Sequence, residues 1–336
     1  MAMLLCNKEE SSWLSTKYGK SAGNTLLAKS LQAVRAASIA SWGKRISSAI
    51  SMPTPAESKR AVHLLFMSIH YAESRCIMRN PKVGLALGAG AFRGFAHIGV
   101  LEVFMQENIQ ISCVSGCSMG SLIGAVFASG MTVPEMKEYI SEFHERQIYD
   151  LTVPRHGMLA GKRMQNIVKE MTGEKTFEDT LIPFAAIACD FETMEEVIFT
   201  EGFLHEAVRA SCSIPGIFVP VTCPNGQVLV DGGLLERVPG GLCRSLGADI
   251  VIGIDVGYRG QRVKTENIMQ HVMHAIDIFE WQIIQQRPSD VDMMITPDVV
   301  DIDPLHIGGR AMECVERGRI AAQEALPHIW KLLSAA

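Results

Sequence analysis

The sequence predicts an α/β fold in which a mainly parallel sheet is flanked by helices. Short apolar runs typical of buried strands alternate with longer segments in which apolar residues recur every three or four positions. Two of the strands, at 83–87 and 111–115, pass directly into helices through glycine-rich turns. This alternation favours parallel pairing, because a chain that returns to start a parallel strand crosses the face of the sheet, usually as a helix.

The remaining elements follow from the same patterns. Helices are expected after the two turns, at 95–105 and 121–128. Further strands are expected at 182–190, 196–200, 226–230, 250–256 and 291–296, and further helices at 206–213, 269–281 and 311–333. We expect the last helix to be interrupted at Pro327, because proline lacks the N–H that a helix interior uses. The segment 131–177 is predicted to be mostly helical.

Charge divides the chain of 336 residues, whose net charge is −5, into two parts. Residues 1–80 carry 11 Lys and Arg against 4 Asp and Glu, and residues 81–336 carry 20 against 32. We therefore expect a basic helical N-terminal extension over 1–80, with helices at 25–50 and 58–78, and a separate domain over 81–336. A basic amphipathic helix at 25–50 fits an anionic membrane surface. It equally fits packing on the domain with its Lys and Arg stems directed outward.

Composition excludes several classes of protein. No run of about 18 apolar residues free of charge occurs, so we expect no transmembrane helix. The nine cysteines contain no C-x-x-C pair, so we expect no metal and no other cofactor, and reduced thiols in the cytoplasm. No nucleic-acid-binding module is recognised, and we expect no nucleic-acid partner. The sequence gives no indication of the oligomeric state.

The most informative motif is the run Gly116-Cys117-Ser118-Met119-Gly120, which lies between a strand and a helix. In a G-x-S-x-G turn of this kind the serine occupies a sharp bend with its hydroxyl exposed, and the following helix directs its positive end at the site. The motif therefore predicts that Ser118 is an activated nucleophile. The alternative is a Gly- and Ser-rich loop that matches the pattern by chance.

A second glycine-rich turn, Gly88-Ala89-Gly90-Ala91-Phe92-Arg93-Gly94, follows the first strand. Backbone N–H groups in such turns bind anions. A dinucleotide site would need G-x-G-x-x-G and an acidic residue after the second strand, but here the third glycine is one place late and a serine turn stands there instead. The turn is therefore predicted to form an oxyanion hole, with a purely structural turn as the alternative.

The third motif is Asp231-Gly232-Gly233, directly after the predicted strand at 226–230. Alone, an Asp-Gly-Gly turn is ordinary hairpin chemistry. Together with the other two motifs it completes a set of oxyanion loop, nucleophile and carboxylate.

This set, in this order, resembles the patatin-like phospholipases, and specifically their bacterial branch. The resemblance covers roughly residues 80–330 and is carried by the runs 93–101, 116–120, 210–218, 231–233 and 248–257. It implies a three-layer fold over 81–336, with Ser118 as nucleophile and Asp231 as its partner in a Ser-Asp dyad. It also implies that the amides around Gly90, Ala91 and Arg93 form the oxyanion hole. The family usually has further glycines where this chain has Ala89 and Ala91.

The resemblance implies hydrolysis of phospholipid or lysophospholipid esters through an acyl-Ser118 intermediate. Aspartate is a weak base unless burial raises its pKa. Apolar residues of the segment 131–177 are candidates for a lid or acyl-chain wall, with ordinary helix packing as the alternative; they are Tyr149, Leu151, Val153, Met158, Leu159 and Met164.

Other interpretations stay open at this point. A histidine base would come from a residue after Asp231, namely His271, His274, His306 or His328. His97 is interpreted as a packed or capping residue. The same dyad would also serve a short-chain ester or thioester hydrolase, and the same fold a catalytically silent binding protein. We expect the enzyme in the cytoplasm; peripheral contact at the inner membrane face is the open alternative to packing of the 25–50 helix on the domain.

Overall fold

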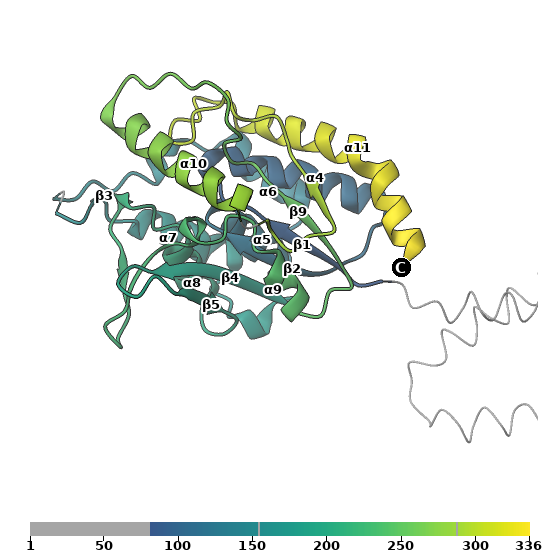
Figure 1. Cartoon of the computed structure of the whole chain (residues 1–336). Helices are drawn as coiled ribbons and strands as arrows, with labels where there is room; N and C mark the ends of the chain where they lie inside the picture. Colours follow the sequence, from purple (N-terminus) through teal and green to yellow (C-terminus); the bar gives the residue numbers. More distant parts are fainter. Residues whose placement is uncertain (1–80, 154, 287) are drawn as a thin grey trace, which may run out of the picture. The chain divides into compact units, whose positions relative to one another are not determined.

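The computed structural model describes residues 81–153, 155–286 and 288–336 (Figure 1). The basic extension over 1–80, its two expected helices and the membrane contact through 25–50 lie outside the described residues. Within the described ranges, none of the helices combines the length and the apolar character needed to cross a bilayer.

An eight-stranded sheet has the order β10-β9-β1-β2-β4-β8-β7, with β5 pairing with β4. Its strands are β1 (Val83–Leu87), β2 (Ile111–Cys117), β4 (Phe184–Asp190), β5 (Glu196–Phe199), β7 (Val221–Thr222), β8 (Val228–Asp231), β9 (Ile250–Ile254) and β10 (Met293–Ile295). The five strands from β10 to β4 are parallel, whereas β5, β8 and β7 are joined by antiparallel pairing. The prediction of a mainly parallel sheet is confirmed. A separate two-stranded sheet pairs β3 (Gly157–Leu159) with β6 (Gly216–Phe218).

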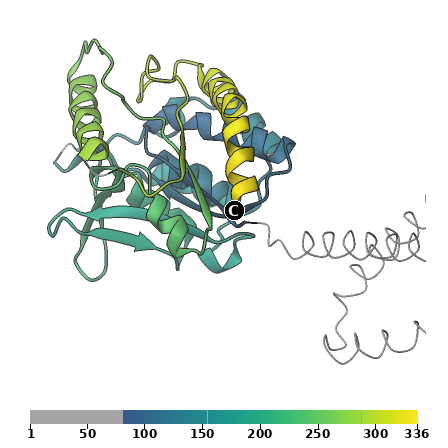
Figure 2. The same cartoon turned by 45° about the vertical axis from the view of Figure 1, so that its right-hand side comes forward.

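Helices cover both faces of the sheet. They are α4 (Ala96–Gln106), α5 (Met119–Ala128), α6 (Val133–Ser141), α7 (Lys162–Thr172), α8 (Leu204–Ser211), α9 (Gly240–Ser245), α10 (Ile268–Gln286) and α11 (Ala311–Ala335). Because side chains alternate along a strand, Leu85 of β1 packs into the main core with α4 and α11, whereas Ala86 packs with Cys243 of α9. Figures 1 and 2 show α11 along α4 on one side of the sheet. This is the three-layer arrangement that the resemblance implied.

The α4–α11 contact is close because each helix has a glycine at the crossing. A Cβ on Gly318 would collide with the carbonyl oxygen of Ala96, and one on Gly99 would collide with that of Val315. The backbones therefore touch directly, which fixes the helix that follows the glycine-rich turn.

Two sequence predictions differ from the structure. The last helix is not interrupted, since α11 continues through Pro327 to Ala335. Pro327 is exposed, while Ala322, Ala325 and Ile329 on the opposite side are buried, so tertiary packing outweighs the lost hydrogen bond. The segment 131–177 contains the short strand β3 as well as helices α6 and α7.

Candidate active site

Ser118 lies on a sharp turn between β2 and α5, with φ 52° and ψ −124°. A positive φ is uncommon for a residue with a side chain and is held here by close backbone packing. A Cβ on Gly120 would collide with the Leu87 carbonyl oxygen. A Cβ on Gly116 would lie 2.5 Å from the Gly120 carbonyl oxygen. Both flanking positions of the motif therefore require glycine. The Ser118 side chain is almost fully buried, at 3% exposure.

The register of the sheet brings Asp231 to Ser118. Cys117, the last residue of β2, is opposite Ile187 of β4, and Asp231 is opposite the next residue, Ala188. Since β4 lies between β2 and β8, the ends of both strands meet at the same level of the sheet. β8 is antiparallel to β4, so this meeting is not the common site at the carboxyl ends of parallel strands. It depends on the exact pairing of the strands.

The end of α8 and the residues that follow it hold both Ser118 and Asp231. The Ser118 N–H donates to the Ser211 hydroxyl oxygen at 2.9 Å, and the Asp231 N–H donates to the Ser213 carbonyl oxygen at 3.0 Å. This segment belongs to the run 210–218 that carries the resemblance, but its residue types predict no role for it. The contacts show that it ties the nucleophile turn to β8.

The Asp231 carboxylate is buried, at 4% exposure, and lies among hydrogen-bond donors. Its Oδ1 accepts from the Gly233 N–H at 2.9 Å and from the Cys117 thiol at 3.8 Å, and the carboxylate is also hydrogen-bonded to the Ser118 side chain. Burial raises the pKa of Asp231 to about 6, although these three donors act in the opposite direction. At neutral pH the carboxylate is therefore ionised and far more basic than an exposed aspartate.

A second buried carboxyl group, that of Glu280 on α10, faces the same place. Its Oε1 would lie 2.5 Å from a Cβ on Gly233, and Asp231 Oδ1 would lie 3.2 Å from the same point, so the two oxygens are at most about 6 Å apart. Burial, and next the charge of Asp231, raise the pKa of Glu280 to about 8. Glu280 is not among the site residues that the sequence motifs predict. The signal in the sequence is that Met273, Asp277 and Glu280 recur at helical spacing. These three are the buried residues of α10.

The glycine-rich turn has only a few free backbone donors. The amides of Gly88, Ala89, Phe92 and Arg93 donate to the carbonyl oxygens of Ile254, Arg237, Pro304 and Gly90, at 2.9, 2.9, 3.1 and 3.1 Å respectively. In the described part of the chain, the amides of Gly90 and Ala91 have no such acceptor. Gly94 has a packing role, since a Cβ there would meet the Met119 side chain.

Gly90 and Ala91 line a cavity of about 20 Å³ together with Ser118, Asp231 and Glu280. This volume holds about one water-sized atom. Ala91 adopts φ 49°, in the left-handed region, and the Cβ of Ala89 packs in a small apolar cluster with Cys117. The turn therefore forms with alanine at both positions.

Arg93 and His97 hold the glycine-rich turn in place through an ion pair and hydrogen bonds. Arg93 is 2% exposed; its Nη1 pairs with Asp277 at 3.2 Å and its Nε donates to the Ile302 carbonyl oxygen at 2.9 Å. His97 donates from Nε2 to the Gly88 carbonyl oxygen at 2.9 Å. Burial lowers the pKa of His97 to about 4, so its ring is neutral. His97 thus positions the turn.

The other candidate histidines have different partners. His306 pairs with Glu145 at 2.7 Å, His271 bonds to the Asn267 carbonyl oxygen, and His274 packs edge-on against Tyr258. No histidine of the described ranges has a hydrogen bond to Ser118. The same ranges contain no group of three His, Cys, Asp or Glu side chains that could hold a metal ion.

A larger pocket of about 550 Å³ opens from Ser118 and is mostly apolar. Five of the six side chains expected to form an acyl-chain wall line it, namely Tyr149, Leu151, Met158, Leu159 and Met164. The sixth, Val153, is not part of the lining and is 71% exposed. The pocket is large enough for a hydrocarbon chain.

Comparisons with known proteins agree with the fold. Residues 85–241 match the family model described as patatin-like phospholipase. Neuropathy target esterase sws of Drosophila melanogaster is 29% identical over 233 residues, which are 67% of this chain and 16% of the fly protein. An uncharacterized NTE family protein of Mycobacterium bovis is 33% identical over 180 residues, 53% of this chain and 49% of that protein. VipD of Legionella pneumophila has a similar structure, with a TM-score of 0.56 and 13% identity over 74% of this chain and 67% of VipD.

The matched region spans about half of the mycobacterial relative and less than a fifth of the fly protein. The relatives come from animals as well as from mycobacteria, so the narrower resemblance to a bacterial branch stays a prediction.

Proposed function

We propose that this chain is a serine hydrolase of lipid esters, because residues 85–241 match the family model described as patatin-like phospholipase. Its substrates are phospholipids or lysophospholipids, cleaved through an acyl-Ser118 intermediate with Asp231 as the base. The observation that carries the proposal is the buried contact between the Ser118 side chain and the Asp231 carboxylate, together with the apolar pocket that Ser118 also lines.

In the first step the Asp231 carboxylate takes the proton of the Ser118 hydroxyl, and Oγ attacks the ester carbonyl carbon. The negative charge that develops on the carbonyl oxygen is stabilised by the free amides of Gly90 and Ala91 and by the N-terminal end of α5. Collapse of this intermediate breaks the bond to the alcohol, which leaves with the proton from Asp231. Water then repeats the sequence on the acyl-enzyme, with Asp231 again as base, and releases the fatty acid.

The raised pKa of Asp231 makes this dyad chemically reasonable. A general base works best when its pKa lies near the working pH, and a value of about 6 meets that condition without a histidine. A carboxylate is nevertheless a weak base. Cleavage of an amide, which has a poor leaving group, would need a stronger one. Esters, with their better leaving groups, are the expected substrates.

Labelling with a fluorophosphonate probe tests the nucleophile. We expect the wild type and a Ser141→Ala control, changed at an exposed serine, to be labelled, and Ser118→Ala and Asp231→Asn to be unlabelled. Labelling of Ser118→Ala equal to that of the wild type would disprove the assignment. Absence of wild-type labelling, even with lipid vesicles, would favour the silent binding protein.

Acyl-chain preference separates lipid esters from the short-chain ester or thioester alternative. We expect kcat/KM to rise with chain length up to the capacity of the apolar pocket. A maximum at two to four carbons would instead favour the short-chain hydrolase.

Cytoplasmic location is part of the proposal and is supported by the seven free cysteines among the described residues.

A further inference from the structure

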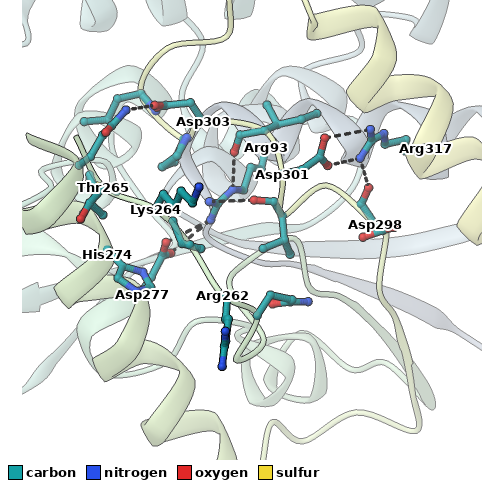
Figure 3. A pocket seen from close by; sticks show the side chains of 18 residues that line it. Arg93, Arg262, Lys264, Thr265, His274, Asp277, Asp298, Asp301, Asp303 and Arg317 are labelled. Carbon is teal, nitrogen blue, oxygen red and sulfur yellow. Dashed lines mark hydrogen bonds and ion pairs between the residues drawn. The ribbon is translucent and has the colours of Figure 1, made fainter. Parts of the chain in front are cut away.

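A polar pocket of about 570 Å³ lies beside the candidate active site and has no role in the chemistry above. It is enclosed by the first half of α10, the segment 261–265 and the segment 298–305 (Figure 3). Its lining is rich in charged side chains, whereas the pocket over Ser118 is mostly apolar.

The polar pocket adjoins the reaction site on two sides. It shares Met273, Asp277 and Pro304 with the small cavity that Ser118 and Asp231 line. It also shares Gln270 and Pro304 with the apolar pocket. A molecule whose ester lies at Ser118 and whose acyl chain fills the apolar pocket would therefore have its alcohol portion next to the polar pocket.

Four of the eight Asp, Lys and Arg side chains that line the polar pocket form ion pairs with one another. Arg93 pairs with Asp277 at 3.2 Å, and Arg317 pairs with Asp301. Asp303 accepts from neutral donors, the backbone N–H groups of Leu305 and His306 and the Gln270 amide, at 2.8 to 2.9 Å.

Lys264 is different, because no hydrogen bond or ion pair to it occurs within the described residues. In Figure 3 its side chain extends over the middle of the pocket, on the side of Arg93. Arg262, two residues earlier and also exposed, is likewise unpaired within the described ranges, but Figure 3 shows its guanidinium directed away from the Arg93–Asp277 pair. Lys264 thus supplies an uncompensated positive charge beside the place where an alcohol portion would lie.

We propose that this polar pocket binds the phosphate-bearing headgroup of the lipid substrate, with Lys264 as the cation that contacts the phosphate. The inference rests on the proposed function and deepens it, because it assigns the two ends of an amphiphile to two adjoining pockets. A lysine ammonium is a common phosphate ligand, and its hydrogen bonds to an anion are stronger than neutral ones.

The test compares two substrates with the same acyl chain, lysophosphatidylcholine and monoacylglycerol, in the same detergent micelles. We expect Lys264→Gln to lower kcat/KM for lysophosphatidylcholine about tenfold, the loss of one charge-assisted hydrogen bond, and to leave kcat/KM for monoacylglycerol within about twofold. Lys264→Arg should retain most of the activity on lysophosphatidylcholine. The matched control Lys331→Gln, at an exposed lysine of α11 that lines neither pocket, should leave both substrates within about twofold.

Equal effects of Lys264→Gln on both lipids, or no effect on either, would overturn the inference alone, provided that the probe still labels Ser118. A wild type that cleaves neither lipid and is not labelled would overturn the proposed function together with the inference. Inorganic phosphate distinguishes a headgroup from a free anion. If it alters monoacylglycerol hydrolysis in a Lys264-dependent way, while the two lipids respond alike to Lys264→Gln, the pocket binds free phosphate and the headgroup assignment is wrong.

Discussion

The stability of this protein should fall with rising pH because of the buried carboxyl group of Glu280. Its pKa is raised from 4.5 to about 8, first by burial and next by the charge of Asp231. The folded protein therefore keeps a proton on Glu280 between pH 4.5 and 8 that the unfolded chain releases. The free energy of unfolding consequently decreases as the pH rises through this window. Replacing the acid by a neutral amide of the same shape, in Glu280→Gln, removes this contribution.

The size of the effect follows from the two pKa values. Each unit of difference between the folded and unfolded states corresponds to about 1.4 kcal/mol, so the complete window amounts to about 5 kcal/mol as an upper limit. Relative to the wild type, Glu280→Gln should gain about 1.4 kcal/mol of unfolding free energy per pH unit from pH 5 to pH 8. The difference between the two proteins should level off above pH 8, where Glu280 is ionised in both states.

Urea unfolding of both proteins at pH 5, 6, 7 and 8 measures this difference. Glu138→Gln is the control for the loss of a surface carboxylate, because Glu138 is exposed on α6. A Glu280→Gln difference that stays constant from pH 5 to pH 8 would show that Glu280 titrates normally, and the electrostatic description of this site would be wrong.

Three further predictions concern the dyad, the turn and the core. The rate of ester hydrolysis should rise about tenfold per unit below pH 6 and level off above it, because Asp231 must be ionised to accept a proton; a pH–rate profile without this limb would exclude Asp231 as the base. Ala91→Gly should raise the free energy of unfolding by up to about 1 kcal/mol, since Ala91 has φ 49°, and thermal melts showing a loss would contradict this. Gly318→Ala should destabilise by several kcal/mol, on the order of 3, because its Cβ would collide with α4, whereas Gly241→Ala, with open space around it, should be neutral or slightly stabilising in the same melts.

Local patterns in the sequence determined most of the elements of the fold. The strand at 83–87, the glycine-rich turn and the serine turn were predicted at their observed positions, because apolar runs and glycine spacing act over a few residues. The wrong prediction at Pro327 has the opposite cause. A proline weakens a helix locally, but packing of Ala322 and Ile329 against the rest of the protein decides whether the helix continues.

The tertiary structure alone decided how the predicted parts meet. Ser118 and Asp231 are 113 residues apart, and only the pairing of β4 with both β2 and β8 brings them together. The raised pKa values of Asp231 and Glu280 likewise depend on burial in the folded chain, and the polar pocket at Lys264 depends on how distant segments enclose it. Residue types and short spacings can be read from the sequence. They determine local conformation and the chemistry of which each side chain is capable. Burial, register and the distances between remote side chains are properties of the folded chain, because they arise from long-range packing.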